Sequence, residues 1–315
     1  MPLFSTRGKT PRLAPELDDV ELGRLLKRLR STKRSSPAGA TDIAVAQIAQ
    51  VLDQDPQNFD RRTHRLSVLA GFLSESHLPA AWVKREPQNV NALVLYSLAE
   101  LEHGRSSGAL TDGSATWRRC HLAADLDPQN PSPWVAMLGI ARLMRAHRRE
   151  VFAIWDEIVA RDRWHREAHL SMLHYLGPQE SGSLSRAIEF ADSELTRMPP
   201  NAPCAAVELE VHLMRYHSAK ARGGAEALLA RDQWGSPQTA QFLDRAQATW
   251  PRLAFFSHAA AVSDLNLLAY ALTAAGRLRG AAPVFEAVGG RVTSWPWRCE
   301  GDPLTVFESA RNKAR

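Results

Sequence analysis

Cysteine is scarce in the sequence. The three cysteines, Cys120, Cys204 and Cys299, are odd in number and far apart, which excludes a disulfide framework and a Cys-x-x-Cys metal or redox pair. No run of 18 or more apolar residues occurs, and the first residues lack the continuous apolar stretch of a secretion signal. We therefore expect a cytoplasmic protein without a membrane-spanning segment.

The sequence also lacks the short motifs of common enzyme classes. It has no G-x-x-x-x-G-K-[ST] loop for phosphates, no G-x-G-x-x-G fingerprint and no G-x-S-x-G nucleophile motif. These absences disfavour catalysis without excluding it, and we predict no cofactor. The hydrophobic share of 44% and the charged share of 23% are those of a soluble globular protein.

Lysine is rare, because 6 of the 39 basic residues are lysines and 33 are arginines. With the abundant alanine, this bias is typical of a GC-rich bacterial genome. The net charge of +5 is a mild excess, far from that of a dedicated nucleic-acid surface. Residues 1–36 hold nine basic and four acidic side chains, so they account for the whole excess, and the rest of the chain is formally neutral.

A four-residue phrase recurs along the chain. Residues 55–58, 86–89 and 127–130 all read acidic-Pro-Gln-Asn, residues 161–164 stand where another phrase is due, and residues 199–201 give a looser echo. The intervals of about 31 to 41 residues indicate a repeat protein. Each proline ends a helix, because it cannot donate the helical hydrogen bond. The asparagine that follows would then cap the next helix.

The apolar residues between these phrases have helical spacing. We predict Thr41, Ser132 and Ser236 as N-caps, and we expect another helix to begin after Asp302. Leucine stripes follow several of the caps, and no segment alternates as a strand would. The fold class is therefore predicted to be all-α.

The residues of one segment, Val262–Gly289, carry a family resemblance. Their spacing is similar to that of a tetratricopeptide-type helical repeat, through Leu265, Leu268, Ala269, Leu272, Gly276, Ala281, Phe285 and Val288. Residues 120–310 also resemble a group of actinobacterial repeat-like proteins to which no activity is assigned. The resemblance implies a right-handed α-solenoid of about six or seven antiparallel helix pairs, with atypical terminal caps.

Residues 1–36 are expected to differ from the rest. A predicted helix, Glu16–Arg30, is followed by a linker rich in serine, and the remaining residues, 37–315, form a single predicted repeat domain. The segment is densely basic and would touch phosphates or an acidic partner, or else form a solvated helix face. Its basic residues are Arg24, Lys27, Arg28, Arg30, Lys33 and Arg34.

Two predicted helices place histidines at helical spacing. His165 and His169 are four residues apart, as are Glu208 and His212, with Tyr216 one turn further along. In a solenoid these stripes would line the concave face and contact a ligand. A metal or acid-base site of His169, Glu208 and His212 is the alternative, although no zinc-protease motif is present and the spacing favours a structural or ligand-lining role.

We therefore expect an interaction protein that binds a peptide or protein segment in the groove of a helical repeat and performs no catalysis. An enzyme built on the same scaffold is one alternative. Nucleic-acid binding through the basic N-terminal segment is another.

Overall fold

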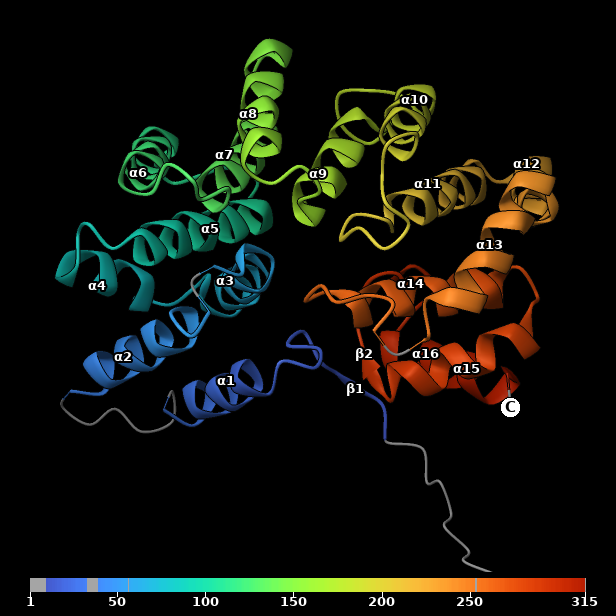
Figure 1. Ribbon diagram of the computed structural model, residues 1–315, viewed down its shortest axis with the longest axis horizontal. Helices are drawn as coiled ribbons and strands as arrows, with labels where there is room; N and C mark the ends of the chain where they lie inside the picture. The colour runs from blue at the N-terminus through green and yellow to red at the C-terminus, as the bar shows by residue number, and fades with distance from the viewer. Residues whose placement is uncertain (1–9, 33–38, 56, 253, 315) are drawn as a thin grey trace, which may run out of the picture. The chain divides into compact units, whose positions relative to one another are not determined.

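The computed structural model describes residues 10–32, 39–55, 57–252 and 254–314. Within these ranges the chain is all-α, as predicted, with sixteen α-helices (Figure 1). Two short 3-10 helices and one pair of two-residue strands complete the described elements. None of the helices found in these ranges is both long and apolar enough to cross a membrane.

The chain divides into two compact units. The division into residues 1–36 and a repeat domain of residues 37–315 stays a prediction. Residues 19–181 form the first, here called the N-terminal unit. Its helices are α1 (Val20–Thr32), α2 (Ala40–Leu52), α3 (Phe59–Leu73), α4 (Leu78–Arg85), α5 (Val90–Ser107), α6 (Gly113–Leu126), α7 (Ser132–Leu143), α8 (Arg148–Arg161) and α9 (Arg166–Leu176).

Residues 1–18 and 182–315 form the second, the C-terminal unit. Its described helices are α10 (Leu184–Leu195), α11 (Val207–Arg222), α12 (Gly224–Leu229), α13 (Pro237–Thr249), α14 (Ala261–Ala274), α15 (Leu278–Val288) and α16 (Pro303–Ala314), with the 3-10 helices η1 (Asp232–Gly235) and η2 (Trp297–Cys299). The strands β1 (Arg12–Leu13) and β2 (Arg291–Val292) pair in parallel and tie the start of the chain to this unit.

The recurrent phrase folds into the same turn each time. The backbone N–H of Asn58, Asn89 and Asn130 donates to the carbonyl three residues earlier, at 3.1 Å in every case. Each asparagine side chain then accepts a backbone N–H at the start of the next helix, at 3.0 to 3.1 Å. One short segment therefore ends one helix and starts the next.

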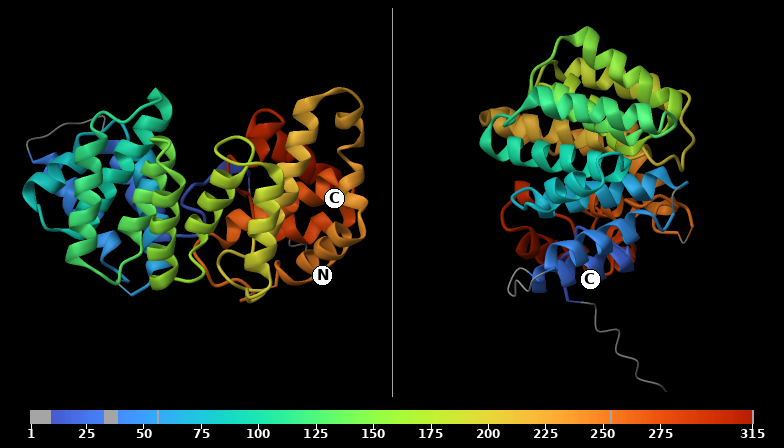
Figure 2. Two further views of the ribbon diagram at one scale, coloured as in Figure 1. Left: turned by 90° about the horizontal axis from the view of Figure 1, so that it is seen from above. Right: turned by 90° about the vertical axis from the view of Figure 1, so that its left-hand side faces the viewer.

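Helices of the N-terminal unit pack in two series. α3 contacts α5, α5 contacts α7 and α7 contacts α9 (Figure 2). α4 contacts α2 and α5, while α6 and α8 each contact the helices before and after them in the chain. The predicted apolar stripes fill the core between them, including Ile48 of α2 and Leu69 of α3, and Trp82 of α4 is buried as well.

The predicted N-terminal helix begins later than expected, at Val20, and belongs to this core. Its leucines, Leu22, Leu25, Leu26 and Leu29, are buried. Asp19 accepts the N–H of Leu22 at 3.0 Å and holds the buried Arg65 of α3 at 2.6 Å. The helix is therefore fixed at its first turn by a capping carboxylate that also pairs with a neighbouring helix.

The segment with the family resemblance forms a helix pair. α14 and α15 contact each other along their length, with a turn at Gly276, whose φ of 73° favours glycine. The apolar positions that carry the resemblance, from Leu265 to Val288, are buried. Trp297 packs against Phe285 and Phe307, so the segment after β2 covers the end of this pair.

Two predicted caps are wrong. α2 begins at Ala40 with Gly39 as its cap, and Thr41 contacts His77 instead. Ser132 is already the first residue of α7, and its N–H donates to Asn130. The cap residue of α7 is Pro131, and the recurrent asparagine, one residue before it, accepts the first N–H of the helix.

Two helical glycines predict opposite effects of an added methyl group. A Cβ at Gly139 of α7 would lie 2.5 Å from the buried Leu101 of α5, whereas a Cβ at Gly71 of α3 would meet nothing within 4 Å. We expect Gly139→Ala to lower the free energy of unfolding by about 1–3 kcal/mol through overpacking. Gly71→Ala is the matched control and should raise stability by up to about 1 kcal/mol, since alanine favours a helix. Urea unfolding measures both, and equal effects would contradict this account of the packing.

Candidate functional site

His165 is the N-cap of α9 rather than a residue of a helix face. Its backbone N–H donates to Asp162 at 3.3 Å, and its Nδ1 accepts the N–H of Ala168 at 3.3 Å. This is the turn of the recurrent phrase, with histidine in the place of asparagine, and it lies one residue later than residues 161–164, where the spacing placed a phrase.

The cap fixes the tautomer of His165. Because Nδ1 accepts a hydrogen bond, the proton of the neutral ring is on Nε2, which donates to the hydroxyl of Thr63 at 3.3 Å. The Thr63 hydroxyl lies 3.2 Å from that of Ser132. All three side chains are buried, so this polar chain joins α3, α7 and the start of α9.

His169 is fully buried one turn along α9. Its Nδ1 donates to the carbonyl of His165 at 2.9 Å, and its ring packs edge-on against Trp155 at 4.8 Å between centroids. The structure therefore brings His165 and His169 together in the interior of the N-terminal unit, where they support packing and capping.

Removal of the His165 ring tests the capping role. His165→Ala loses both the cap and the bond to Thr63, and we expect it to lower the free energy of unfolding by about 1–2 kcal/mol. His165→Asn keeps a capping oxygen and should recover part of that loss. The exposed His147, which caps α8, is the control, and His147→Ala should cost less. Thermal unfolding of the four proteins would contradict the role if His165→Ala melted like the wild type.

Glu208, His212 and Tyr216 lie on α11 of the C-terminal unit and do not converge on one site. Glu208 lines an apolar cavity of about 800 Å³ beside α13 and lies 3.6 Å from Arg245. His212 packs against Phe242 at 5.7 Å between centroids, and its Nδ1 lies 3.4 Å from the hydroxyl of Thr239. Tyr216 lines a different cavity, described below.

The basic side chains of α1 that the structure describes form an exposed face. Arg24, Lys27, Arg28 and Arg30 are all exposed. Arg24 pairs with Glu21, and the Arg30 guanidinium lies 5.6 Å from the centre of the Phe72 ring. Lys33 and Arg34 lie outside the described residues. Phosphate or acidic-partner binding by this face stays a prediction.

The described residues give no group of three or more His, Cys, Asp or Glu side chains placed to hold a metal ion. The metal alternative for the histidine stripe therefore gains no support from the geometry.

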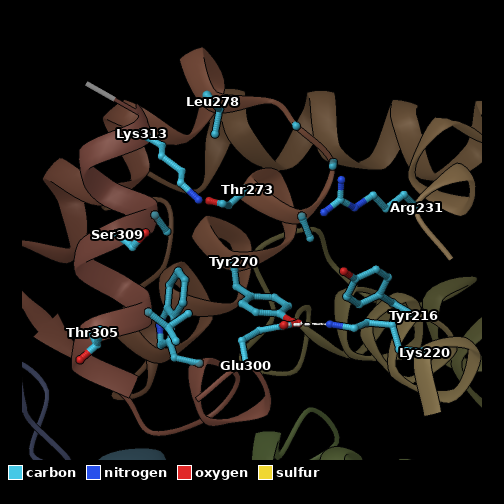
Figure 3. A pocket seen from close by; sticks show the side chains of 16 residues that line it. Tyr216, Lys220, Arg231, Tyr270, Thr273, Leu278, Glu300, Thr305, Ser309 and Lys313 are labelled. Carbon is cyan, nitrogen blue, oxygen red and sulfur yellow. Dashed lines mark hydrogen bonds and ion pairs between the residues drawn. The ribbon is translucent and has the colours of Figure 1, made fainter. Parts of the chain in front are cut away.

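The C-terminal unit contains a cavity of about 780 Å³ with an unusual charge balance. Its charged and hydroxyl-bearing lining comes from α11, the segment before η1, α14, the residue after η2, and α16 (Figure 3). Tyr270 and Trp297 form an aromatic wall, with ring centroids 5.4 Å apart. The polar lining residues are Tyr216, Lys220, Arg231, Tyr270, Thr273, Glu300, Thr305, Ser309 and Lys313.

Glu300 is the carboxylate of this lining and is held by two neighbours. The Lys220 ammonium donates to both of its oxygens, at 2.6 and 2.8 Å, and the Tyr270 hydroxyl donates to one of them at 2.7 Å. Burial opposes ionisation of Glu300, but the hydrogen bonds from Lys220 and Tyr270 prevail and lower its pKa. Burial and the bond to Glu300 raise the pKa of Tyr270, so at neutral pH Glu300 is an anion and Tyr270 a neutral donor.

Two further cations in the lining have no counter-ion among the described residues. Arg231 and Lys313 are exposed and make no ion pair within the part of the chain that the structure describes. In Figure 3 the Lys313 ammonium points toward the Thr273 hydroxyl, and the Arg231 guanidinium extends from the other side. With Lys220 matched by Glu300, the described lining carries an excess of two positive charges beside an aromatic surface.

Of the residues predicted to bind a ligand, Tyr216 is the one that lines this cavity. Other lining residues could have been predicted from helical spacing. Lys220 follows Tyr216 by four residues, and a polar stripe at intervals of four is formed by Thr305, Ser309 and Lys313. Arg231, Tyr270 and Glu300 come from other elements, and no local spacing connects them.

No model of a known protein family matches the chain, and no curated protein matches it.

Half-buried histidines predict a loss of stability in mild acid. Desolvation lowers the pKa of His64, His212 and His217, and it lowers that of His212 from 6.5 to about 4. Between these two values the unfolded chain binds more protons at His212 than the folded chain, so stability falls as the pH drops from about 6.5 to about 4. His212→Gln should reduce this pH dependence, and the exposed His103→Gln is the control. Urea unfolding at several pH values gives the slopes, and equal slopes for wild type and His212→Gln would contradict the prediction.

Proposed function

We propose that the protein is a non-enzymatic interaction module that binds an acidic peptide or protein segment, and that the C-terminal cavity is its binding site. The excess of positive charge from Arg231 and Lys313 beside the aromatic wall carries this proposal. Cationic side chains would hold the carboxylates of the segment, and the apolar lining would accept a neighbouring side chain. The proposed site does not include the predicted histidines or Glu208, but Tyr216 is one of its lining residues.

The cavity has a size suited to such a ligand. Binding pockets of about 300–1,000 Å³ hold molecules of a few peptide residues, and this cavity measures about 780 Å³. Ser309 adds an exposed hydroxyl group on α16 that would bond to a peptide backbone.

The architecture we propose is a tetratricopeptide-like array of antiparallel helix pairs, a right-handed solenoid within each unit. The contacts of α3, α5, α7 and α9 in series support it, as does the turn that recurs between the helices. The scarcity of cysteine fits a cytoplasmic protein, which is part of the proposal.

Charge removal in the cavity tests the proposed site. The probe is a capped peptide with four glutamates around one phenylalanine, and its partner peptide has glutamines in place of the glutamates. By titration calorimetry we expect the glutamate peptide to bind more tightly, and Arg231→Gln or Lys313→Gln to weaken it by up to about fivefold each. Added salt should weaken it further.

Arg197→Gln is the matched control, since Arg197 is exposed in the same unit and does not line the cavity. Equal affinity for the two peptides would refute the proposed function. An equal loss in Arg197→Gln would show that the attraction is a general property of the surface.

A further inference from the structure

Glu300 is an acidic side chain placed in a cavity whose other charges are positive. Three hydrogen bonds from α11 and α14 reach its carboxylate, so the protein already binds one carboxylate within the cavity. Lys220 gives two of these bonds, and no other lining carboxylate is found among the described residues. Figure 3 shows the Lys220–Glu300 pair in the lining, apart from Arg231 and Lys313.

We propose that Glu300 is an internal competitor of acidic ligands, because its carboxylate occupies the Lys220 ammonium that a ligand carboxylate would otherwise bind. The inference rests on the proposed function of the cavity. It adds a third anion subsite, formed by Lys220 and the Tyr270 hydroxyl, which opens when Glu300 leaves. Ligands with one or two carboxylates would use Arg231 and Lys313, and a more acidic ligand would displace Glu300.

The exposure of the pair permits this exchange. The side chains of Lys220 and Glu300 are 37% and 32% exposed, so Glu300 can turn into solvent without crossing the core. An exposed ion pair has a modest net stability. A ligand whose other carboxylates are held by Arg231 and Lys313 would therefore replace Glu300 at Lys220 at little cost. The Lys220 ammonium also lies 5.4 Å from the centre of the Tyr216 ring, which keeps it within the cavity when Glu300 is absent.

Substitution of Glu300 tests the competition. With the same capped glutamate peptide, Glu300→Gln should bind about fivefold more tightly than the wild type, since the amide no longer neutralises Lys220. Glu300→Ala should give the same gain in affinity, which would show that the gain does not depend on the glutamine side chain introduced by Glu300→Gln. In Lys220→Met/Glu300→Gln the affinity should return to within about twofold of the wild type, because the freed ammonium is gone.

Glu308→Gln is the control for a general effect of charge. Glu308 is exposed on α16, pairs with Arg311 and does not line the cavity. Thermal unfolding verifies that each variant is folded before titration.

The outcomes separate this inference from the proposed function. Wild-type binding with no gain in Glu300→Gln and Glu300→Ala, or an equal gain in Glu308→Gln, overturns the inference and leaves the function standing. Binding that appears only after Glu300 is replaced supports the inference. If none of the proteins prefers the glutamate peptide to the glutamine peptide, both proposals fail.

Discussion

A short hydrogen-bonded turn organises the N-terminal unit. In each copy an acidic residue offers its carbonyl to an N–H three residues later, and the side chain at that position caps the next helix. Because helix ends leave backbone groups without partners, a turn that satisfies both ends allows the chain to reverse within a few residues. The apolar faces of successive helices then meet and form the core. His165 also links its cap to other helices. Its Nε2 donates to the Thr63 hydroxyl, which lies within hydrogen-bond distance of the Ser132 hydroxyl, and all three side chains are buried.

The candidate site depends on a different principle, the uneven pairing of charge. Lys220 is matched by Glu300, whereas Arg231 and Lys313 face the same cavity without a counter-ion in the described chain. In our proposal, these exposed cations beside the aromatic wall would attract anions with an apolar part, and the Glu300 carboxylate would control how many of the cations a ligand can use. The proposed binding and the proposed competition would then be two consequences of one arrangement of charges.

Local patterns in the sequence predicted the helices well. The acidic-Pro-Gln-Asn phrase indicated each turn, and the spacing from Leu265 to Val288 predicted the α14–α15 pair. The same kind of reasoning placed His165 and His169 on a binding surface, although both are buried. Spacing shows which residues share a side of a helix, but it does not show whether that side is covered by a neighbouring helix. The caps at Thr41 and Ser132 failed because both residues lie inside their helices, after the cap residues Gly39 and Pro131.

The sequence by itself determined the all-α class, the position of the turns and the leucine stripes, because these depend on interactions between residues a few positions apart. The polar stripe of α16 and the Tyr216–Lys220 pair can also be recognised in the sequence, because their members are four residues apart. Only the tertiary structure decided that Lys220, Tyr270 and Glu300 meet, since they lie on separate elements whose approach depends on packing of the whole unit. This packing decides that Lys220 pairs with Glu300 and that Arg231 and Lys313 have no partner among the described residues. No spacing along the chain predicts that difference.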